Sequence, residues 1–397
     1  MSDKVLLYYD DAMLGHNPTG WDPAHPEWTA AVQALLREQY GSEEEAASQW
    51  THPERPARLS AVRDALLETA PTNVEWRSPR AAEPAELARV HTRKHVTLIE
   101  GLAGRACWLD VDTTAVSPDS VTAARLAAGS GISALEAIAA GDARRAFCCL
   151  RPPGHHALAE RAMGFCLYNN MAVAAAHALE ALGMERVLIV DWDLHHGNGT
   201  QDIFYHRNDV LFCDTHCSAP FYPGTGRLNE TGDGAGTNRT LNVPLPAGSG
   251  NAAVIAAFEQ IFVPAARAFE PQAILVSSGY DGHYLDQTFA MDAPGFAQLT
   301  RIVMELADRL CDGRLVLMME GGYNAEALAD GACACVATLA GAASPEPARQ
   351  DDDPGLAAVA QAVACHAARL HPDVFAEPSG RQPRRQTGDA SESRHTR

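Results

Sequence analysis

Residues 187–198 read Val187-Leu188-Ile189-Val190-Asp191-Trp192-Asp193-Leu194-His195-His196-Gly197-Asn198. The first four are apolar and mostly β-branched, which is typical of a strand buried on both faces of a parallel sheet. Polar residues begin at Asp191, where this strand is expected to end. Ligands bind at the carboxyl ends of strands in open α/β sheets, so this stretch predicts both a fold class and the place of a site.

Apolar runs of this kind recur along the chain and alternate with amphipathic runs of helical period. We expect strands at Val5–Tyr9, Ala146–Leu150, Val187–Val190, Val210–Cys213, Ala273–Ser277 and Leu315–Met319. We expect helices at Ala57–Leu67, Val121–Ala140, Met171–Leu182, Asn251–Phe269, Phe296–Leu310 and Asn324–Leu339. Pro56, Ser120 and Gly183 should mark a first helical turn, an N-cap and a helix end. The alternation predicts a mostly parallel sheet with helices on both faces, in three α/β/α layers.

Two segments differ from this pattern. Residues 17–50 carry Trp21, Trp28 and Trp50 together with a run of three glutamates at 43–45, and are predicted to form an extended loop. Residues 377–397 are rich in Ser, Arg and Gln with almost no apolar side chains, so we expect a disordered tail. The sequence therefore predicts a single domain over residues 1–376.

The overall composition narrows the class of protein. With 46% hydrophobic and 20% charged residues, the chain resembles an ordinary globular protein. A formal net charge of -19 disfavours direct nucleic-acid binding and suits basic substrates, or serves solubility alone. We find neither a membrane-spanning run nor a signal peptide, and so expect a cytoplasmic protein with no membrane partner. The ten scattered cysteines are expected to be buried thiols.

The polar residues after the 187–190 run have the pattern of a metal site. Asp191, Asp193 and His195 alternate with apolar residues, so an extended backbone points all three to one face. Two of them could ligate a metal together with Asp281, which follows another expected strand. Three protein ligands leave a position open for water, as in catalytic zinc sites, and mixed oxygen and nitrogen ligands also admit iron(II). A surface loop with incidental charges is the alternative, which the combination of residues disfavours.

Two further motifs follow expected strands. His155 and His156 come after Arg151-Pro152-Pro153-Gly154 and are candidates for proton transfer beside a metal. Tyr323 follows a Gly-Gly pair and could donate to a developing oxyanion. Taken singly, a His-His pair is more often structural and such a tyrosine more often anchors a loop.

Together these motifs resemble those of a known superfamily. They comprise the segments at residues 151–156, 191–198, 279–283 and 320–324, with supporting matches at 52–59, 164–170 and 222–226. Their order and spacing resemble the arginase-fold deacetylases, that is, histone deacetylases and acetylpolyamine amidohydrolases, from about Val5 to Gly341. Within the superfamily the chain is most similar to the class II-like bacterial histone deacetylase-like amidohydrolases. The resemblance implies an arginase/deacetylase-like α/β fold and removal of an acetyl group from an amine.

The resemblance also implies catalytic roles. Zinc would be held by Asp193, His195 and Asp281. His156 would be the general base, and His155, paired with Asp191, its electrostatic partner. Tyr323 would polarise the acetyl carbonyl.

Further roles concern substrate and a second ion. Phe165, Tyr222, Gly164 and Asp112 would bind substrate, the first two as walls of a narrow tunnel. Arg58 would lie near an internal exit for acetate. A structural potassium ion is implied near Asp191, held partly by backbone oxygens of Asp193 and His195.

The chain departs from the family pattern at three places. Asn198 stands where class I members have aspartate, so His156 should be less basic. Asp214 stands where serine is expected beside the potassium site and adds negative charge there. The loop over residues 17–50 is longer than in many relatives. Its position after the first strand and its tryptophans and glutamates fit a specificity loop over the tunnel mouth, and they fit a solvated surface insertion with buried tryptophans equally well.

Two other functions fit parts of the sequence. An arginase-like hydrolase would share the fold but bind two manganese ions. A catalytically idle module would bind an acylated lysine without cleaving it. The substrate of a deacetylase stays open between acetyl-lysine, acetylpolyamines and other N-acyl amines, and a homo-oligomer is compatible with the sequence.

Overall fold

A parallel sheet of eight strands lies at the centre of the protein, in the order β2-β1-β5-β10-β9-β6-β7-β8. The computed structural model describes residues 4–18, 52–110, 114–343, 345–347, 350–367 and 369. All neighbouring strands of this sheet run parallel, so their carboxyl ends lie along one edge. A separate antiparallel pair joins β3 (Cys107–Trp108) and β4 (Ala115–Val116).

The six expected strands are all present. They are β1 (Val5–Tyr8), β5 (Arg145–Cys148), β6 (Val187–Asp191), β7 (Val210–Cys217), β9 (Ala273–Ser278) and β10 (Leu315–Met319). The sequence missed the two edge strands, β2 (Val74–Arg77) and β8 (Thr240–Leu245). Strand β2 is only half-buried and carries the ion pair between Arg77 and Glu75, while β8 contains Pro244, a residue tolerated at a sheet edge.

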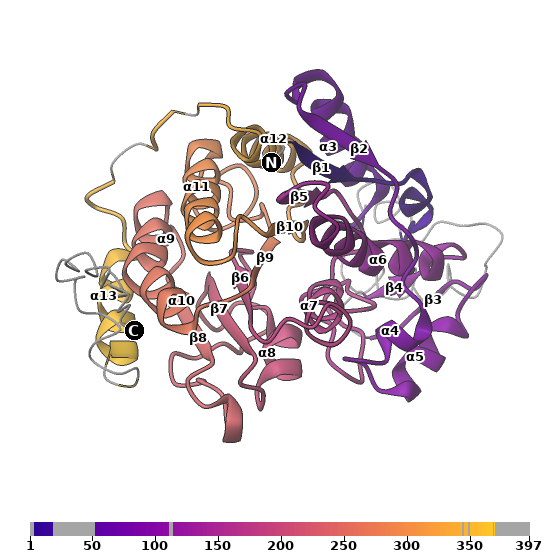
Figure 1. Ribbon diagram of the computed structural model, residues 1–397, viewed down its shortest axis with the longest axis horizontal. Helices are drawn as coiled ribbons and strands as arrows, with labels where there is room; N and C mark the ends of the chain where they lie inside the picture. The colour runs from indigo at the N-terminus through magenta and orange to yellow at the C-terminus, as the bar shows by residue number, and fades with distance from the viewer. Residues whose placement is uncertain are drawn as a thin grey trace, which may run out of the picture.

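Helices cover both faces of the sheet (Figure 1). On one face α6 (Ser120–Ala139) packs on β1, β5 and β10, α7 (Asn170–Glu180) on β6 and β9, and α8 (Asn198–Phe204) on β7. On the other, α11 (Ala293–Leu310) packs on β9 and β10, and α12 (Ala325–Leu339) on β5 and against α3 (Pro56–Thr69). The predicted three-layer α/β/α arrangement is therefore confirmed.

The described residues also form several further elements. They are η1 (Asp11–Gly15), α4 (Pro84–Leu87), α5 (Arg93–Glu100), η2 (Gly234–Gly236), α9 (Asn251–Ala257), η3 (Phe258–Phe262), α10 (Val263–Phe269) and α13 (Leu356–Ala367). The expected continuous helix over residues 251–269 is thus interrupted by η3, a π-helical segment. Pro264 lies in the first turn of α10 and has no N–H for the usual helical bond, which accounts for the change of helix type.

Two expected helix ends have different outcomes. Ser120 is not the N-cap of α6, because it lies inside the helix; its Oγ instead accepts from the Ser117 N–H at 2.6 Å. Its hydroxyl also lies 2.6 Å from Nδ1 of His16. Gly183 follows α7 with φ +70°, the left-handed conformation expected after a helix end.

Three other predictions concern the cysteines, membrane-spanning helices and the two atypical segments. All ten cysteines are free thiols, and most are buried, as expected. Among the described residues one helical stretch, residues 251–269, is long and apolar enough to cross a membrane, but 56% of it is buried inside the protein, as for a core helix. Most of the loop at 17–50, the tail at 377–397 and Asp112 lie outside the described residues. The single-domain extent of 1–376 stays a prediction.

Candidate active site

The predicted site residues meet at the centre of the sheet's carboxyl edge. His155 and His156 follow β5, Asp193 and His195 follow β6, Asp281 follows β9, and Tyr323 follows β10. These four strands are adjacent, in the order β5-β10-β9-β6. Segments far apart in the sequence therefore deliver their side chains to one place.

Asp193, His195 and Asp281 form a group that could hold a metal ion. Their candidate ligand atoms all lie within 4.8 Å of one another. Nδ1 of His195 is 3.1 Å from Oδ1 of Asp193 and 2.8 Å from Oδ2 of Asp281. Both carboxylates are fully buried, yet Asp281 Oδ2 has no partner in hydrogen-bonding geometry. Because a buried carboxylate oxygen without a hydrogen bond is costly, this donor set fits a bound cation.

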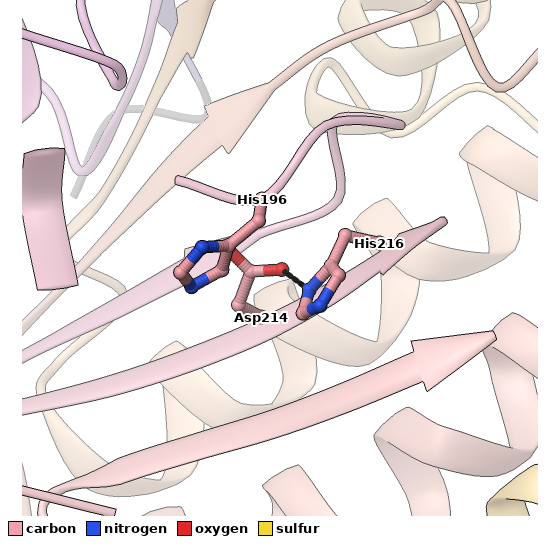
Figure 2. Close-up of side chains that lie close together, drawn as sticks. All are labelled: His196, Asp214 and His216. Carbon is pink, nitrogen blue, oxygen red and sulfur yellow. Dashed lines mark hydrogen bonds and ion pairs between the residues drawn. The ribbon is translucent and has the colours of Figure 1, made fainter. Parts of the chain in front are cut away.

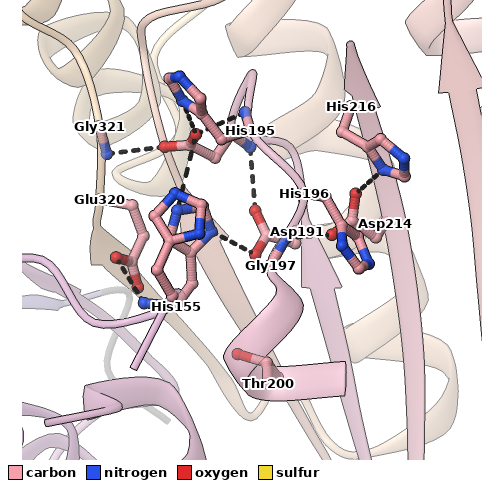
Figure 3. Close-up of polar contacts among 12 residues, drawn as sticks. His155, Asp191, His195, His196, Gly197, Thr200, Asp214, His216, Glu320 and Gly321 are labelled. Carbon is pink, nitrogen blue, oxygen red and sulfur yellow. Dashed lines mark hydrogen bonds and ion pairs between the residues drawn. The ribbon is translucent and has the colours of Figure 1, made fainter. Parts of the chain in front are cut away.

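Backbone groups and glycines fix the carboxylates of this group. Gly321 N donates to Asp193 Oδ2 at 2.7 Å, the dashed contact at Gly321 in Figure 3. Leu194 N donates to Asp281 Oδ1 at 2.9 Å. A Cβ on Gly321 would lie 2.4 Å from Asp281 Oδ2 and 2.5 Å from Asp193 Oδ2. A Cβ on Gly279 would lie 2.0 Å from Asp193 Oδ2. The first Gly of the Gly-Gly turn is therefore required because backbone approaches the carboxylates closely.

The electrostatics of the group also favour a cation. Burial alone would lower the pKa of His195, but the charges of Asp281 and Asp193 outweigh it and raise that pKa to about 9. Burial, reinforced by the charge of Asp193, raises the pKa of Asp281. The charge of Asp193 thus raises the cost of ionising Asp281, and a shared cation would relieve that repulsion.

The two adjacent histidines have different partners. His155 Nδ1 lies 3.0 Å from Asp191 Oδ2, whereas His156 Nδ1 lies 2.7 Å from Asn198 Oδ1. Burial lowers the pKa of His156 well below its ordinary value, and the charges of His155 and His195 lower it further. Burial also opposes the charge of His155, but Asp193 and Asp191 outweigh this and raise its pKa well above the ordinary value. One imidazole is thus held neutral beside one held charged.

A pocket of about 660 Å³ opens onto these groups. It is lined by Pro53, His156, Gly164, Phe165, His195, Tyr222, Leu285, Asp286, Gln287, Tyr323 and Asn324. The ring of Phe165 lies 5.7 Å from that of Tyr323, and the ring of Tyr222 lies 5.2 Å from that of His156. Gly164 has φ +56°, and a Cβ there would lie 2.4 Å from His156 Cδ2. The chain can therefore approach His156 closely only with glycine at this position.

Arg58 lies behind Tyr323, on the side away from solvent. Its guanidinium is 4.9 Å from the Tyr323 ring centroid and is itself buried. It donates to the backbone oxygens of Gly322 and Glu320 and, at 3.1 Å, to Glu54 Oε1. Burial raises the pKa of Tyr323 well above its ordinary value, with Arg58 opposing the shift, so the phenol keeps its proton at neutral pH.

Residues 52–339 match the family model described as the histone deacetylase domain. The chain belongs to the histone deacetylase family. A probable deacetylase of Archaeoglobus fulgidus is 38% identical over 74% of this chain and 81% of its own length. A histone deacetylase-like amidohydrolase of Pseudomonas aeruginosa is 39% identical over 70% of this chain and 73% of its own. The crystal structure of the HDA15 HD domain matches with a TM-score of 0.80 and 31% identity, covering 94% of this chain and 97% of that one. The predicted family and fold are confirmed.

A second polar cluster of this deacetylase family member lies beside the first (Figure 3) and is drawn by itself in Figure 2. His196, Asp214 and His216 also bring candidate ligand atoms within 4.8 Å of one another. Asp214 Oδ1 lies 2.6 Å from His216 Nδ1, and Asp214 Oδ2 accepts from Gly197 N at 2.8 Å. The other ring nitrogen of His216 faces Gly226 O at 2.9 Å.

The nitrogens of His196 are occupied as well. Nδ1 lies 2.8 Å from Thr225 Oγ1, and Nε2 lies 3.0 Å from Gln201 Oε1. The cluster is therefore a satisfied hydrogen-bond network, which links the segment bearing Tyr222 to the start of α8, where Asn198 lies. The sequence drew attention to Asp214 as an added charge but gave no sign of its partner His216.

Glu320 and Asp286 were also missed as contributors to the site. Glu320 is the first residue of the motif at 320–324. Its Oε2 accepts from Gly154 N at 2.7 Å and from His155 N at 3.2 Å (Figure 3). Its place directly after β10 was the available signal. Asp286 lies in an irregular loop, where no periodicity or motif marks it.

Proposed function

We propose that this member of the histone deacetylase family is a zinc-dependent amidohydrolase that removes acetyl or other acyl groups from acetyl-lysine or acetylpolyamine-type amines. The observation that carries the proposal is the convergence at one pocket of the Asp193–His195–Asp281 group with His156 and Tyr323. Each of these parts answers a separate need of amide hydrolysis.

Asp193, His195 and Asp281 would hold the ion. Three protein ligands leave room for water and a substrate carbonyl, as in catalytic zinc sites, and the same oxygen and nitrogen donors also admit iron(II). Bound there, zinc would polarise the amide carbonyl and lower the pKa of a bound water toward about 7.

His156 is the proposed general base and acid. Its lowered pKa keeps the imidazole neutral at neutral pH, so it can take a proton from the attacking water. The imidazole of His156 then returns a proton to the leaving amine. His155, charged and bonded to Asp191, would stabilise negative charge developing nearby.

Tyr323 is the proposed oxyanion donor. Its phenol is protonated at neutral pH, and Tyr323 lines the same pocket as His156. Donation to the carbonyl oxygen would strengthen as that oxygen gains charge, which lowers the barrier to attack. Arg58, stacked behind the ring, supports it from within the protein.

The pocket suits a narrow, uncharged or cationic substrate arm. Phe165 and Tyr222 offer aromatic walls to a methylene chain. Among the described lining residues there is no Lys or Arg. Acetyl-lysine and acetylpolyamines both offer a narrow methylene chain without negative charge. The comparison of kcat/KM described below distinguishes these two substrate classes.

A structural potassium ion is proposed next to Asp191. Asp191 and Asp214 occupy paired positions of β6 and β7, and both are fully buried. A monovalent cation held by Asp191 and by backbone oxygens of Asp193 and His195 would offset that charge. Three further properties stay predictions: a cytoplasmic location, the absence of nucleic-acid and membrane partners, and a homo-oligomer.

The test compares kcat/KM for acetyl-lysine peptides, acetylputrescine, acetylspermidine and longer acyl groups, before and after removal of metal. We expect turnover that disappears on chelation and returns with one equivalent of zinc per chain. Two manganese ions per chain with ureohydrolase activity would instead establish the arginase-like alternative. Binding of an acylated amine without turnover would establish the idle module.

A further inference from the structure

The loop between β9 and α11, residues 279–292, borders the pocket from one side. Leu285, Asp286 and Gln287 of this loop line the pocket. The loop is folded onto itself: Tyr284 N donates to Met291 O at 2.8 Å, and Met291 N donates to Gly282 O at 3.1 Å. Because it starts at the strand that delivers Asp281, its position is fixed relative to the proposed metal ligands.

Asp286 reaches from this loop to the turn that bears Tyr323. Its Oδ2 accepts from Tyr323 N at 2.6 Å and from Asn324 N at 2.7 Å. In return, Asn324 Nδ2 donates to Leu285 O at 3.0 Å. Both bonds to Asp286 are short for N–H···O contacts, as expected when the acceptor is ionised.

The turn needs such an anchor because of its composition. Gly322 has φ +120°, a conformation that only glycine adopts readily, and it directly precedes Tyr323. The side chain itself is held by ring contacts, with Phe165 at 5.7 Å and the Arg58 guanidinium at 4.9 Å. Such contacts restrain a ring less strictly than hydrogen bonds fix a backbone.

We propose that Asp286 is a positioning residue for Tyr323, which fixes the backbone of the Gly321-Gly322-Tyr323-Asn324 turn relative to Asp281. The inference rests on the proposed function, in which the Tyr323 phenol acts on the substrate carbonyl. A displacement of about 1 Å at a reacting group costs on the order of a hundredfold in rate, so a bond at this backbone bears directly on kcat.

The acceptor atom, rather than the full charge, is what the turn requires. In the described part of the chain no group donates to Asp286 Oδ1, so the NH2 of an asparagine could take that place. Burial and the charge of Asp281 raise the pKa of Asp286 to about 6, so the native side chain is still ionised at neutral pH. Asp286→Asn keeps the acceptor, whereas Asp286→Ala removes it.

The experiment is a double-mutant cycle on the metal-loaded full chain, with Asp286→Ala, Asp286→Asn, Tyr323→Phe and Asp286→Ala/Tyr323→Phe. We expect Asp286→Ala to lower kcat by about 10–100-fold with little change in KM, the scale of a misplaced catalytic group. Asp286→Asn should keep kcat within about threefold of the parent, since the acceptor remains. In the Tyr323→Phe background, Asp286→Ala should cost no more than about twofold, because the two changes remove one function.

Gln272→Ala is the matched control. Gln272 Oε1 likewise accepts from two consecutive backbone N–H groups, those of Glu185 and Arg186, but at the amino end of the sheet. Its removal should lower stability without lowering kcat. Amide hydrogen exchange adds a readout independent of turnover: the amides of Tyr323 and Asn324 should exchange faster in Asp286→Ala and at the parent rate in Gln272→Ala.

Three results would overturn the inference. One is an Asp286→Ala loss of equal size with and without the Tyr323 hydroxyl. Another is an Asp286→Asn loss as large as that of Asp286→Ala. The third is unchanged exchange of the Tyr323 and Asn324 amides in Asp286→Ala. If the parent chain turns over no acylated amine, the proposed function fails, and the exchange experiment alone decides the role of Asp286.

Discussion

Replacing Gly321 by alanine should weaken metal binding through the crowding of two carboxylates at once. The added Cβ would lie 2.4 Å from Asp281 Oδ2 and 2.5 Å from Asp193 Oδ2, and both distances are below the 3.0 Å that real Cβ atoms keep. Each oxygen must therefore retreat by about half an ångström, whereas functional metal sites keep ligand distances within about 0.2 Å. We expect zinc affinity to fall by about 10–100-fold, the scale seen when ligand orientation is disturbed.

The assay is competition for zinc against a chelator of known affinity, with kcat measured at saturating zinc. Gly282→Ala is the matched control, because its Cβ would meet its nearest neighbour, Phe289 Cδ2, only at 3.6 Å. Activity of Gly321→Ala should recover with excess zinc, since the ligands remain. Parental zinc affinity in Gly321→Ala would refute the assignment of Asp193 and Asp281 as a ligand pair.

Four other variants test the proton and oxyanion roles. Tyr323→Phe should retain metal and lower kcat by about a hundredfold or more, as for loss of an oxyanion donor; an effect on KM alone would make Tyr323 a binding residue. His156→Ala should lower kcat more than His155→Ala, because only His156 is assigned both proton transfers; equal losses would mean that the roles are shared. Asn198→Asp should raise the pKa of His156 through its bond at Nδ1. Protonation would then remove the base at a higher pH, so the acidic limb of the kcat/KM profile should move upward, and an unmoved limb would contradict the contact.

The centre of the fold was readable from sequence because burial leaves a simple signal there. The run at 187–190 is apolar throughout, and every residue of β6 is buried. The same logic failed at the edges, where β8 contains Pro244 and β2 is exposed enough to carry charged residues. A hydrophobic sequence pattern arises from burial, so an element that is only half-buried has a weak hydrophobic pattern.

Some residues of the candidate site could likewise be predicted from the sequence, and others could not. Asp193, His195 and Asp281 were found because each follows a recognisable strand, and parallel strands bring their ends together. Asp286 and His216 act through contacts with segments distant in sequence, Tyr323 and Asp214, and those contacts depend on loop geometry. No local pattern encodes such pairings. The expected N-cap at Ser120 was wrong for a related reason, since His16 competes for its hydroxyl.

The order of strands in the sheet has a consequence for how the protein matures. Strand β10 is the last of the described strands to leave the ribosome, yet it lies in the middle of the sheet, between β5 and β9. A nascent chain that has not reached Leu315 therefore has a gap where Gly321 and Tyr323 belong, and Asp193 lacks the N–H that holds its Oδ2. Domains fold largely as units once their sequence is complete, so the metal group can take its final shape only after synthesis has passed the Gly-Gly turn. Loading of the proposed metal would thus be a late event, possible only once β10 has joined the sheet.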